Sequence, residues 1–167
     1  MTACECFLGN FEPILLTTRE TYLTSPGDNT PDSSYTENAD FWVRIIRDRL
    51  DRYRSELTDQ AVLEAIGPAD RLTILDAGCG EGYLSRIFAQ DGAKTIGVDA
   101  CTDLVKSSQE LAAETGLPIN YYVGTVDNLP IPDGQYDIVA CNHLINDLQD
   151  IATRSVSLRW RPGSAAV

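Results

Sequence analysis

Three glycines at alternate positions, Gly78, Gly80 and Gly82, are the residues of this sequence best placed to build a ligand site. Glycine is found where the backbone must adopt unusual dihedral angles or where another molecule must come close to it. An acid, Asp76, stands two residues before the first of them. A glycine loop at the carboxyl end of a parallel strand is where open α/β sheets bind ligands. We therefore expect a small-molecule site here, with Asp76 able to hold the loop and to lie near a positively charged group of the ligand.

The spacing of these glycines separates two classes of nucleotide cofactor. The dinucleotide fingerprint is Gly-x-Gly-x-x-Gly, and its third glycine would fall at Tyr83, so it is not matched. The pattern present, Asp-x-Gly-x-Gly-x-Gly, resembles the first motif of class I S-adenosylmethionine-dependent methyltransferases. S-adenosylmethionine has no diphosphate to seat on a helix end, and a loop of bare backbone can pack against its amino-acid end and its ribose. A glycine-rich turn that only joins a strand to a helix remains the alternative.

A second acid, Asp99, ends the next apolar segment, residues 93–99. In nucleotide-binding α/β folds an acid at this place accepts hydrogen bonds from ribose hydroxyls, and a carboxylate offers two acceptor oxygens to two adjacent donors. The alternative role is a cap for the helix predicted to start near Thr102. NAD and S-adenosylmethionine share this ribose, so Asp99 alone does not choose between them.

Residues 125–143 extend the resemblance, because an Asn-Leu-Pro loop, a Pro-Asp-Gly turn and an aromatic-Asp-apolar strand are similar to a second methyltransferase block. The resemblance implies that the methionine end is lined by Asp76, Gly78, Cys79, Gly80 and Gly82. It implies that Asp99 holds the ribose, with Ala100 against the adenine and the backbone of Val126 at the adenine edge. Asn142 and His143 would face the donor methyl and the acceptor. Thr125 stands where the family often has an acid on the adenine amino group; Thr125 can accept that hydrogen bond, or Asp127 could substitute.

The elements that must position these residues alternate between strand and helix. Apolar segments at 72–75, 93–99 and 119–124, and a fourth after Tyr136, are typical of strands. Helical periodicity follows the glycines up to Gly92 and recurs over residues 102–115. The sequence therefore predicts an α/β, Rossmann-like open sheet of parallel strands with helices on both faces.

Residues 1–70 are predicted to form an N-terminal extension on the substrate side, before a cofactor domain at 71–167. Residues 24–38 are turn formers and predict a loop. Residues 41–57 predict a helix, capped by Asn38 or Asp40, that buries one face. That face consists of Trp42, Ile46, Leu50, Tyr53 and Leu57. A shorter helix near 59–66 ends at Gly67-Pro68. Aromatic residues here could roof a substrate pocket, although core packing is favoured for Trp42.

The C-terminal residues predict an incomplete sheet. Arg161-Pro162-Gly163 resembles the turn before the family's fifth strand, and residues 164–167 would begin that strand. The family's sheet normally has seven strands, so we expect a truncated or altered end. An open sheet edge invites pairing with another chain, and a homodimer could cover it.

Composition excludes several other functions. The net charge of −12 opposes nucleic-acid binding. No apolar run is long enough to span a bilayer, and the first residues lack a basic region followed by an apolar one, so we expect a cytoplasmic protein without membrane contact. The five cysteines are odd in number and irregularly spaced, which predicts no disulfide framework. With His143 as the only histidine, no metal site is expected.

These features predict methyl transfer from S-adenosylmethionine to a small molecule of the secondary-metabolite type, with S-adenosylhomocysteine as product. The N-terminal helices add to this by their similarity to natural-product methyltransferases. His143 is the candidate general base for a hydroxyl acceptor, with a structural role as its alternative. Two other functions stay open: a module that binds S-adenosylmethionine without turnover, and an NAD-dependent oxidoreductase.

Overall fold

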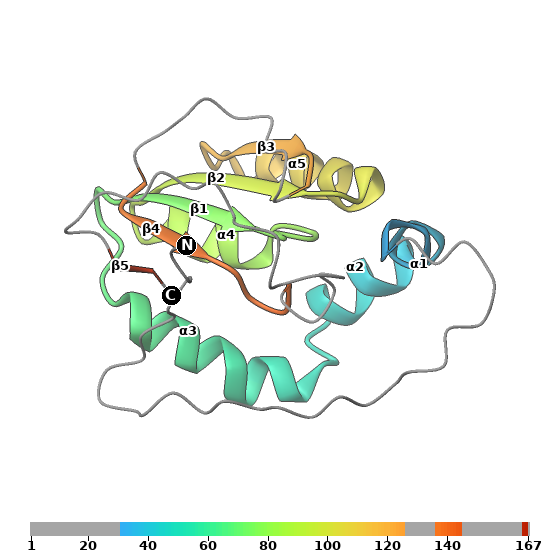
Figure 1. Ribbon diagram of the computed structural model, residues 1–167, viewed down its shortest axis with the longest axis horizontal. Helices are drawn as coiled ribbons and strands as arrows, with labels where there is room; N and C mark the ends of the chain where they lie inside the picture. Colours follow the sequence, from blue (N-terminus) through green and yellow to red (C-terminus); the bar gives the residue numbers. More distant parts are fainter. Residues whose placement is uncertain (1–30, 126–135, 145–164, 167) are drawn as a thin grey trace, which may run out of the picture.

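The described residues form an open sheet of parallel strands. The computed structural model describes residues 31–125, 136–144 and 165–166. Within them the sheet has the order β3-β2-β1-β4-β5, and every neighbouring pair is parallel (Figure 1). The strands are β1 (Thr73–Ala77), β2 (Lys94–Asp99), β3 (Asn120–Val123), β4 (Ile138–Ala140) and β5 (Ala165–Ala166). The predicted Rossmann-like sheet is confirmed.

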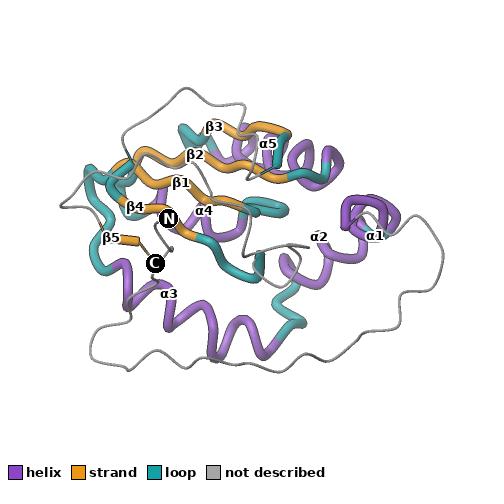
Figure 2. Tube along the Cα trace, in the orientation of Figure 1, coloured by secondary structure: helices purple, strands orange, loops and turns teal. Residues whose placement is uncertain are grey.

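The strand order reverses direction beside β1. The chain moves outward from β1 through β2 to β3 and then returns to the other side of β1 as β4. Open α/β sheets bind ligands outside the carboxyl ends of the strands at such a reversal. The loops that follow β1, β2 and β4 lie together at this end of the sheet (Figure 2). The glycine loop and Asp99 are therefore placed where a ligand is expected.

Among the described residues, three helices pack against one face of the sheet. They are α3 (Asp59–Ile66), α4 (Tyr83–Gln90) and α5 (Thr102–Thr115). Side chains alternate between the two faces along a strand. Ile74 and Ile138 are partners in β1 and β4, and both share a cluster with Phe88 of α4. Leu63 of α3 packs against the same cluster, while α5 packs against β3 through a second cluster around Tyr121. Helices were predicted on both faces, and among the described residues they cover this face of the sheet.

The loop predicted over residues 24–38 is wrong for its second half. Residues 31–37 form helix α1 (Pro31–Glu37), and residues 24–30 lie outside the described part of the chain. Proline suits the first helical position, because its missing amide would have no partner there and its fixed φ fits the helix. A turn-forming composition is thus compatible with a short helix that starts on a proline.

The helix predicted over residues 41–57 is interrupted. Helix α2 (Ala39–Arg47) ends first, and a π-helical turn, η1 (Arg54–Thr58), then leads directly into α3. Arg49 takes a φ of 53°; its N–H donates to the carbonyl of Ile46, and the N–H of Leu50 donates to the carbonyl of Ile45. These two bonds make the Schellman arrangement that closes a helix. Asn38 stands at the start of α2 as predicted, but its side-chain amide donates to the carbonyl of Ser34 in α1 and makes no capping hydrogen bond to α2.

The break also changes which apolar residues are buried. Leu50, Tyr53 and Leu57 are 56%, 65% and 55% exposed, so the single buried face predicted for 41–57 is wrong. Trp42 is half-buried and packs against the cluster that includes Cys101 at the start of α5, which agrees with the core-packing prediction. The break therefore splits the predicted stripe into a packed part on α2 and an exposed part beyond it.

The division between an extension at 1–70 and a cofactor domain at 71–167 stays a prediction. Helix α2 packs on α5, so the described residues of the two parts are in contact. Within the described residues, none of the helices has the length and apolar character needed to cross a membrane.

Candidate functional site

The glycine loop uses most of its amide groups internally. Gly78, Gly80 and Gly82 have φ values of 77°, 54° and 79°. The amides of Gly78 and Cys79 both donate to the carbonyl of Val98 in β2, at 2.8 and 3.0 Å. The amide of Gly80 donates to Oδ2 of Asp99 at 2.8 Å, and that of Gly82 donates to the carbonyl of Cys79 at 2.9 Å. These four donors are engaged within the protein and are not offered to a ligand.

Of the three loop glycines, only the middle one borders open space. A Cβ atom at Gly82 would overlap the hydroxyl of Tyr121, which donates to the carbonyl of Gly82 at 3.3 Å. A Cβ atom at Gly78 would lie 2.9 Å from Leu144, just past β4. At Gly80 a Cβ atom would meet no atom of the described residues within 4 Å. The outer glycines are therefore required by packing around the loop, whereas Gly80 lines space that a ligand can fill.

Asp99 ties the glycine loop to the end of β2. Its Oδ2 accepts the hydrogen bond from Gly80, and its Oδ1 accepts the amide of Cys101 at 2.9 Å. Cys101 is the residue from which α5 starts, so Asp99 takes part in the helix-start role that was its alternative. A carboxylate oxygen can accept two hydrogen bonds. The ribose contact therefore stays a prediction that this geometry allows.

Asp76 lies beneath the loop, on the side of α4. It is 2% exposed, and Ser85 donates its hydroxyl to Oδ2 of Asp76 at 2.6 Å. Burial raises the pKa of Asp76 to about 6; the Ser85 hydrogen bond opposes this rise and the nearby charge of Asp99 adds to it. Asp76 thus holds the start of α4 against β1. Its predicted contact with the ammonium of a ligand stays a prediction.

Strand β4 brings Asn142 and His143 to the same end of the sheet. His143 is exposed, has a φ of 61°, and its Nε2 lies 3.1 Å from Oγ1 of Thr58 in η1. Nδ2 of Asn142 is buried and has no hydrogen-bond partner among the described residues. The candidate base is therefore held by the N-terminal helices, and Asn142 offers a buried donor beside it in the chain.

A buried pair joins η1 and α3 to the helix that follows the glycines. The hydroxyl of Tyr83, the first residue of α4, donates to Oδ2 of Asp59 at 2.9 Å. Asp59 is 4% exposed. Desolvation raises the pKa of Asp59, against the lowering effects of the Tyr83 hydrogen bond and the Arg54 charge. The sequence analysis singled out neither partner; a tyrosine directly after the last glycine is the signal that could have pointed to it.

The remaining predicted cofactor residues lie at the borders of the site. The side chain of Cys79 is buried with Val105 and Tyr121, so only its backbone can face a ligand, and burial raises the pKa of its thiol. Ala100 and Thr125 are exposed, after β2 and β3 respectively. Val126 and Asp127 lie outside the described residues.

Sequence reasoning missed Glu81, the residue between the last two glycines. Its side chain is fully buried. The carboxylate accepts hydrogen bonds from Nη2 of Arg86, at 2.8 and 3.0 Å, and from Nε of Arg47, at 3.0 Å. Nη1 of Arg86 also donates to the carbonyl of Glu81 at 2.6 Å. A charged residue enclosed by glycines, with an arginine five positions later, is the sequence signal of this cluster.

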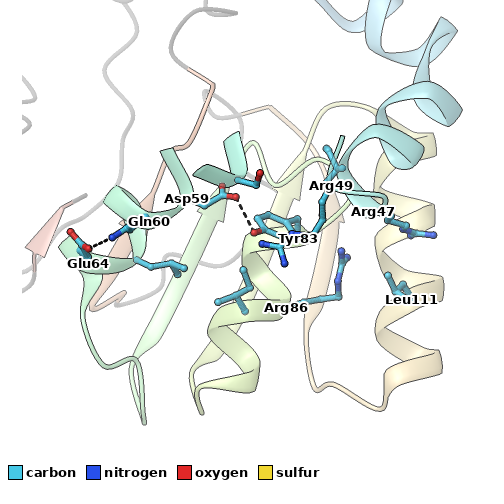
Figure 3. Close-up of a pocket in the computed structure, with 12 residues that line it drawn as sticks. Arg47, Arg49, Asp59, Gln60, Glu64, Tyr83, Arg86 and Leu111 are labelled. Atoms are coloured by element: carbon cyan, nitrogen blue, oxygen red, sulfur yellow. Dashed lines mark hydrogen bonds between the residues drawn. The ribbon is translucent and has the colours of Figure 1, made fainter. Parts of the chain in front are cut away.

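A cavity of about 850 Å³ lies over the outer surface of α4 (Figure 3). Its walls come from the N-terminal helices, α4 and α5, and include Arg47, Arg49, Asp59, Tyr83, Arg86 and Leu111. In Figure 3 Asp59 and Tyr83 point toward one another across it. None of the predicted cofactor residues lines this cavity, so it is separate from the open space beside Gly80. Among the residues that the structure describes, no group of three or more potential ligands could hold a metal ion.

Comparison with known proteins places the chain in a family. Residues 75–157 match the family model of a methyltransferase domain. The chain is 30% identical over 98 residues to the ubiquinone biosynthesis O-methyltransferase of Methylobacterium sp. (strain 4-46), covering 58% of this chain and 39% of that protein. The protein of the same name from Bordetella avium (strain 197N) is 33% identical over 105 residues, covering 61% and 44%. The chain thus spans less than half the length of these curated relatives.

A solved structure extends the similarity to the fold. Magnesium protoporphyrin IX methyltransferase from Synechocystis PCC 6803, with bound S-adenosylmethionine, matches with a TM-score of 0.61 at 25% identity. The match covers 75% of this chain and 67% of that chain. A second structure of that protein, with S-adenosylhomocysteine bound, matches with a TM-score of 0.56 at 27% identity and covers 66% and 55%.

The parallel sheet, its glycine loop and the acid that ends β2 define an α/β protein of the nucleotide-cofactor type. The comparisons support the class I S-adenosylmethionine-dependent methyltransferase that the sequence resemblance predicts, through the methyltransferase-domain match over residues 75–157 and the similarity to these relatives. S-adenosylmethionine is the cofactor of this family. The residues present fit it, because Gly80 leaves room beside the loop and Asn142 holds a buried donor with no partner among the described residues.

Proposed function

We propose that this chain transfers the methyl group of S-adenosylmethionine to a small-molecule acceptor and releases S-adenosylhomocysteine. The names of its relatives refer to ubiquinone biosynthesis and to magnesium protoporphyrin IX, both small molecules, which supports this acceptor class. The net charge of −12 argues against a nucleic-acid acceptor. A secondary-metabolite acceptor is the finer form of the proposal, supported by the sequence resemblance of the N-terminal helices.

The proposal rests mainly on one observation: four amides of the glycine loop donate their hydrogen bonds to other groups of the protein. A diphosphate bridge is bound by free N–H groups at a glycine loop and helix start. Here the amides of Gly78, Cys79, Gly80 and Gly82 all donate to acceptors of the protein. The loop therefore presents bare Cα surface at Gly80, which suits the uncharged and cationic parts of a sulfonium nucleoside and not a diphosphate. This favours S-adenosylmethionine over NAD.

The chain's own residues would supply alignment and proton transfer. S-adenosylmethionine supplies a methyl group that its sulfonium already activates, so the main task of the protein is to orient the acceptor. His143 follows β4 and is held by Thr58, and it would take the proton of a hydroxyl acceptor through its ring. In this proposal η1 sets the orientation of the base from the N-terminal side.

Calorimetric titration tests the cofactor part of the proposal. We expect S-adenosylhomocysteine to bind and NAD to give no heat of binding; binding of NAD alone would replace the proposal by an oxidoreductase. An assay of S-adenosylhomocysteine release with candidate hydroxyl acceptors then separates a transferase from a module that binds without turnover.

Substitution of His143 tests the acceptor part. With an accepted hydroxyl substrate, His143→Ala should lower kcat by roughly 100-fold or more, the usual range for a lost general base, and leave the Kd of S-adenosylhomocysteine unchanged. Full turnover in this variant would reduce His143 to a structural residue.

A further inference from the structure

Glu81 lies inside the glycine loop, and its buried side chain is bound by Arg47 and Arg86. We propose that Glu81 and Arg47 are positioning residues, which fix the glycine loop for the amino-acid end of S-adenosylmethionine. Helix α2 carries Arg47, so it contributes to cofactor affinity by holding the loop at Glu81. This inference rests on the proposed function, since it concerns the same cofactor.

The burial of Glu81 shows that its ion pairs are part of the loop structure. The Glu81 side chain is 0% exposed, whereas those of Arg86 and Arg47 are 12% and 34% exposed. A buried carboxylate is costly unless it is paired and hydrogen-bonded. Here three N–H···O contacts from two guanidinium groups enclose it. The loop can keep this geometry only while both arginines are in place.

The loop needs such an anchor because its neighbours are glycines. Gly80 and Gly82 flank Glu81, and both lie in the left-handed region. Glycine is the residue with the largest backbone freedom to lose, so the loop keeps its shape here only through its backbone hydrogen bonds and the ion pairs of Glu81. Glu81 is the side chain between them, and it is tied to α4 through Arg86.

Arg47 connects this anchor to the N-terminal helices. Its Nε donates to Glu81, while its Nη2 donates to the carbonyl and the hydroxyl of Ser107 in α5, at 3.0 and 2.8 Å. At the other end of α2, Ala39 packs with Cys101, two residues after Asp99. Helix α2 therefore contacts both segments that carry predicted cofactor residues. Loss of Arg47 would loosen the loop at Glu81 and leave the hydrogen bond between Gly80 and Asp99, on the ribose side, in place.

This asymmetry gives the proposal a test. The Kd values of S-adenosylhomocysteine and methylthioadenosine, which lacks the amino-acid end, are measured by calorimetry for the wild type, Glu81→Gln, Arg47→Gln and the double variant. Glu81→Gln should raise the Kd of S-adenosylhomocysteine roughly tenfold, because the loop then spends about a tenth of its time in the binding geometry. The Kd of methylthioadenosine should rise by less than about threefold in the same variant. Arg47→Gln should also lose more affinity for S-adenosylhomocysteine than for methylthioadenosine. The double variant should lose no more affinity than Glu81→Gln alone, because both residues act through one network.

The exposed pair Arg52–Glu56 supplies the matched control. Its side chains are 80% and 61% exposed, and Glu56→Gln makes the same charge change as Glu81→Gln without touching the loop. Glu56→Gln should leave both affinities unchanged. Equal losses for the two ligands, additive losses in the double variant, or no loss would each overturn the proposal. If the wild type itself does not bind S-adenosylhomocysteine, the proposed function fails instead.

A second variant covers the case in which Glu81→Gln does not fold. Arg47 is partly exposed and can be replaced by lysine, which keeps the positive charge but cannot bridge Glu81 and Ser107 with one planar group. Arg47→Lys should still weaken S-adenosylhomocysteine more than methylthioadenosine. Wild-type affinities in a folded Arg47→Lys would show that the bridge does not position the loop.

Discussion

The three loop glycines are glycines for different reasons, and substitution should separate these reasons. At Gly82 an added methyl would overlap Tyr121 at a positive φ, whereas at Gly80 it would meet no atom within 4 Å among the described residues. Gly82→Ala should lose roughly 2–5 kcal/mol of stability, from left-handed strain and overpacking together. Gly80→Ala should lose only about 1–2 kcal/mol but weaken S-adenosylhomocysteine by tenfold or more, because its methyl enters the crevice. Urea unfolding and calorimetry measure the two effects; the reverse ranking would place the ligand elsewhere.

Asp76 makes the stability of the fold depend on pH. Burial raises its pKa from an ordinary value of 3.8 to about 6 in the folded protein. Between these values the unfolded chain has lost a proton that the folded protein keeps, so the free energy of unfolding falls as pH rises from about 4 to about 6 and is level above that. The full effect is about 3 kcal/mol, at 1.36 kcal/mol for each pKa unit.

Asp76→Asn is the control for this pH dependence. Asparagine keeps an acceptor for the Ser85 hydroxyl but does not titrate. Burial also raises the pKa of Asp59, with the same sign, so the informative quantity is the wild-type curve minus the Asp76→Asn curve in urea unfolding. Parallel curves between pH 4 and pH 6 would show that Asp76 ionises in the folded protein as it does in the unfolded chain.

For single residues, the sequence predicted those site residues that are marked by their position next to a predicted strand. Gly80 and Asp99 were found because each stands at the end of a strand, and the structure joins them by a hydrogen bond. Pairs that meet only in the fold leave no periodic pattern. Glu81 binds Arg47 from 34 residues away, and His143 meets Thr58 across 85 residues. Such contacts depend on where α2 and η1 dock, which the order of residues does not specify.

Among the elements, regular alternation was easier to predict than breaks. The strands were found because short apolar runs end at glycines or acids, and α5 ends at Gly116 as predicted. The helix predicted over 41–57 failed at Arg49, because arginine occupies a left-handed position that usually carries glycine. Its apolar spacing continued across a break that no turn residue marks. The sequence pattern thus indicated helix correctly on both sides but not the change of direction between them.

The same break gives an element-scale prediction. Arg49 closes α2 at a φ of 53°, where a side chain costs about 1 kcal/mol relative to glycine. Arg49→Gly should therefore be more stable than Arg49→Ala by roughly 0.5–1 kcal/mol, because both variants lose the charge near Asp59 and only glycine removes the strain. Urea unfolding at one pH measures the difference. Equal stability of the two variants would mean that the Schellman turn does not strain Arg49.

For the whole molecule, cofactor binding should appear as added stability. The glycine loop, Asp99 and β4 come together only in the folded sheet, so S-adenosylhomocysteine should bind the folded chain and not the unfolded one. At 100 times its Kd it should add about 2.7 kcal/mol, which raises the Tm of a chain of this size by roughly 5–10 °C. Thermal unfolding followed by circular dichroism measures this shift, and NAD at the same concentration should give none.

The Gly80→Ala variant turns this shift into a test of location. It still folds in the first prediction but binds S-adenosylhomocysteine at least tenfold more weakly, so at the same ligand concentration it should gain about 1.4 kcal/mol less stabilisation. The shift in both proteins should grow with the logarithm of the ligand concentration, with the two lines displaced by the ratio of the Kd values. Identical lines would mean that the nucleoside stabilises the sheet from somewhere other than the open side of Gly80, because the added methyl fills only that side.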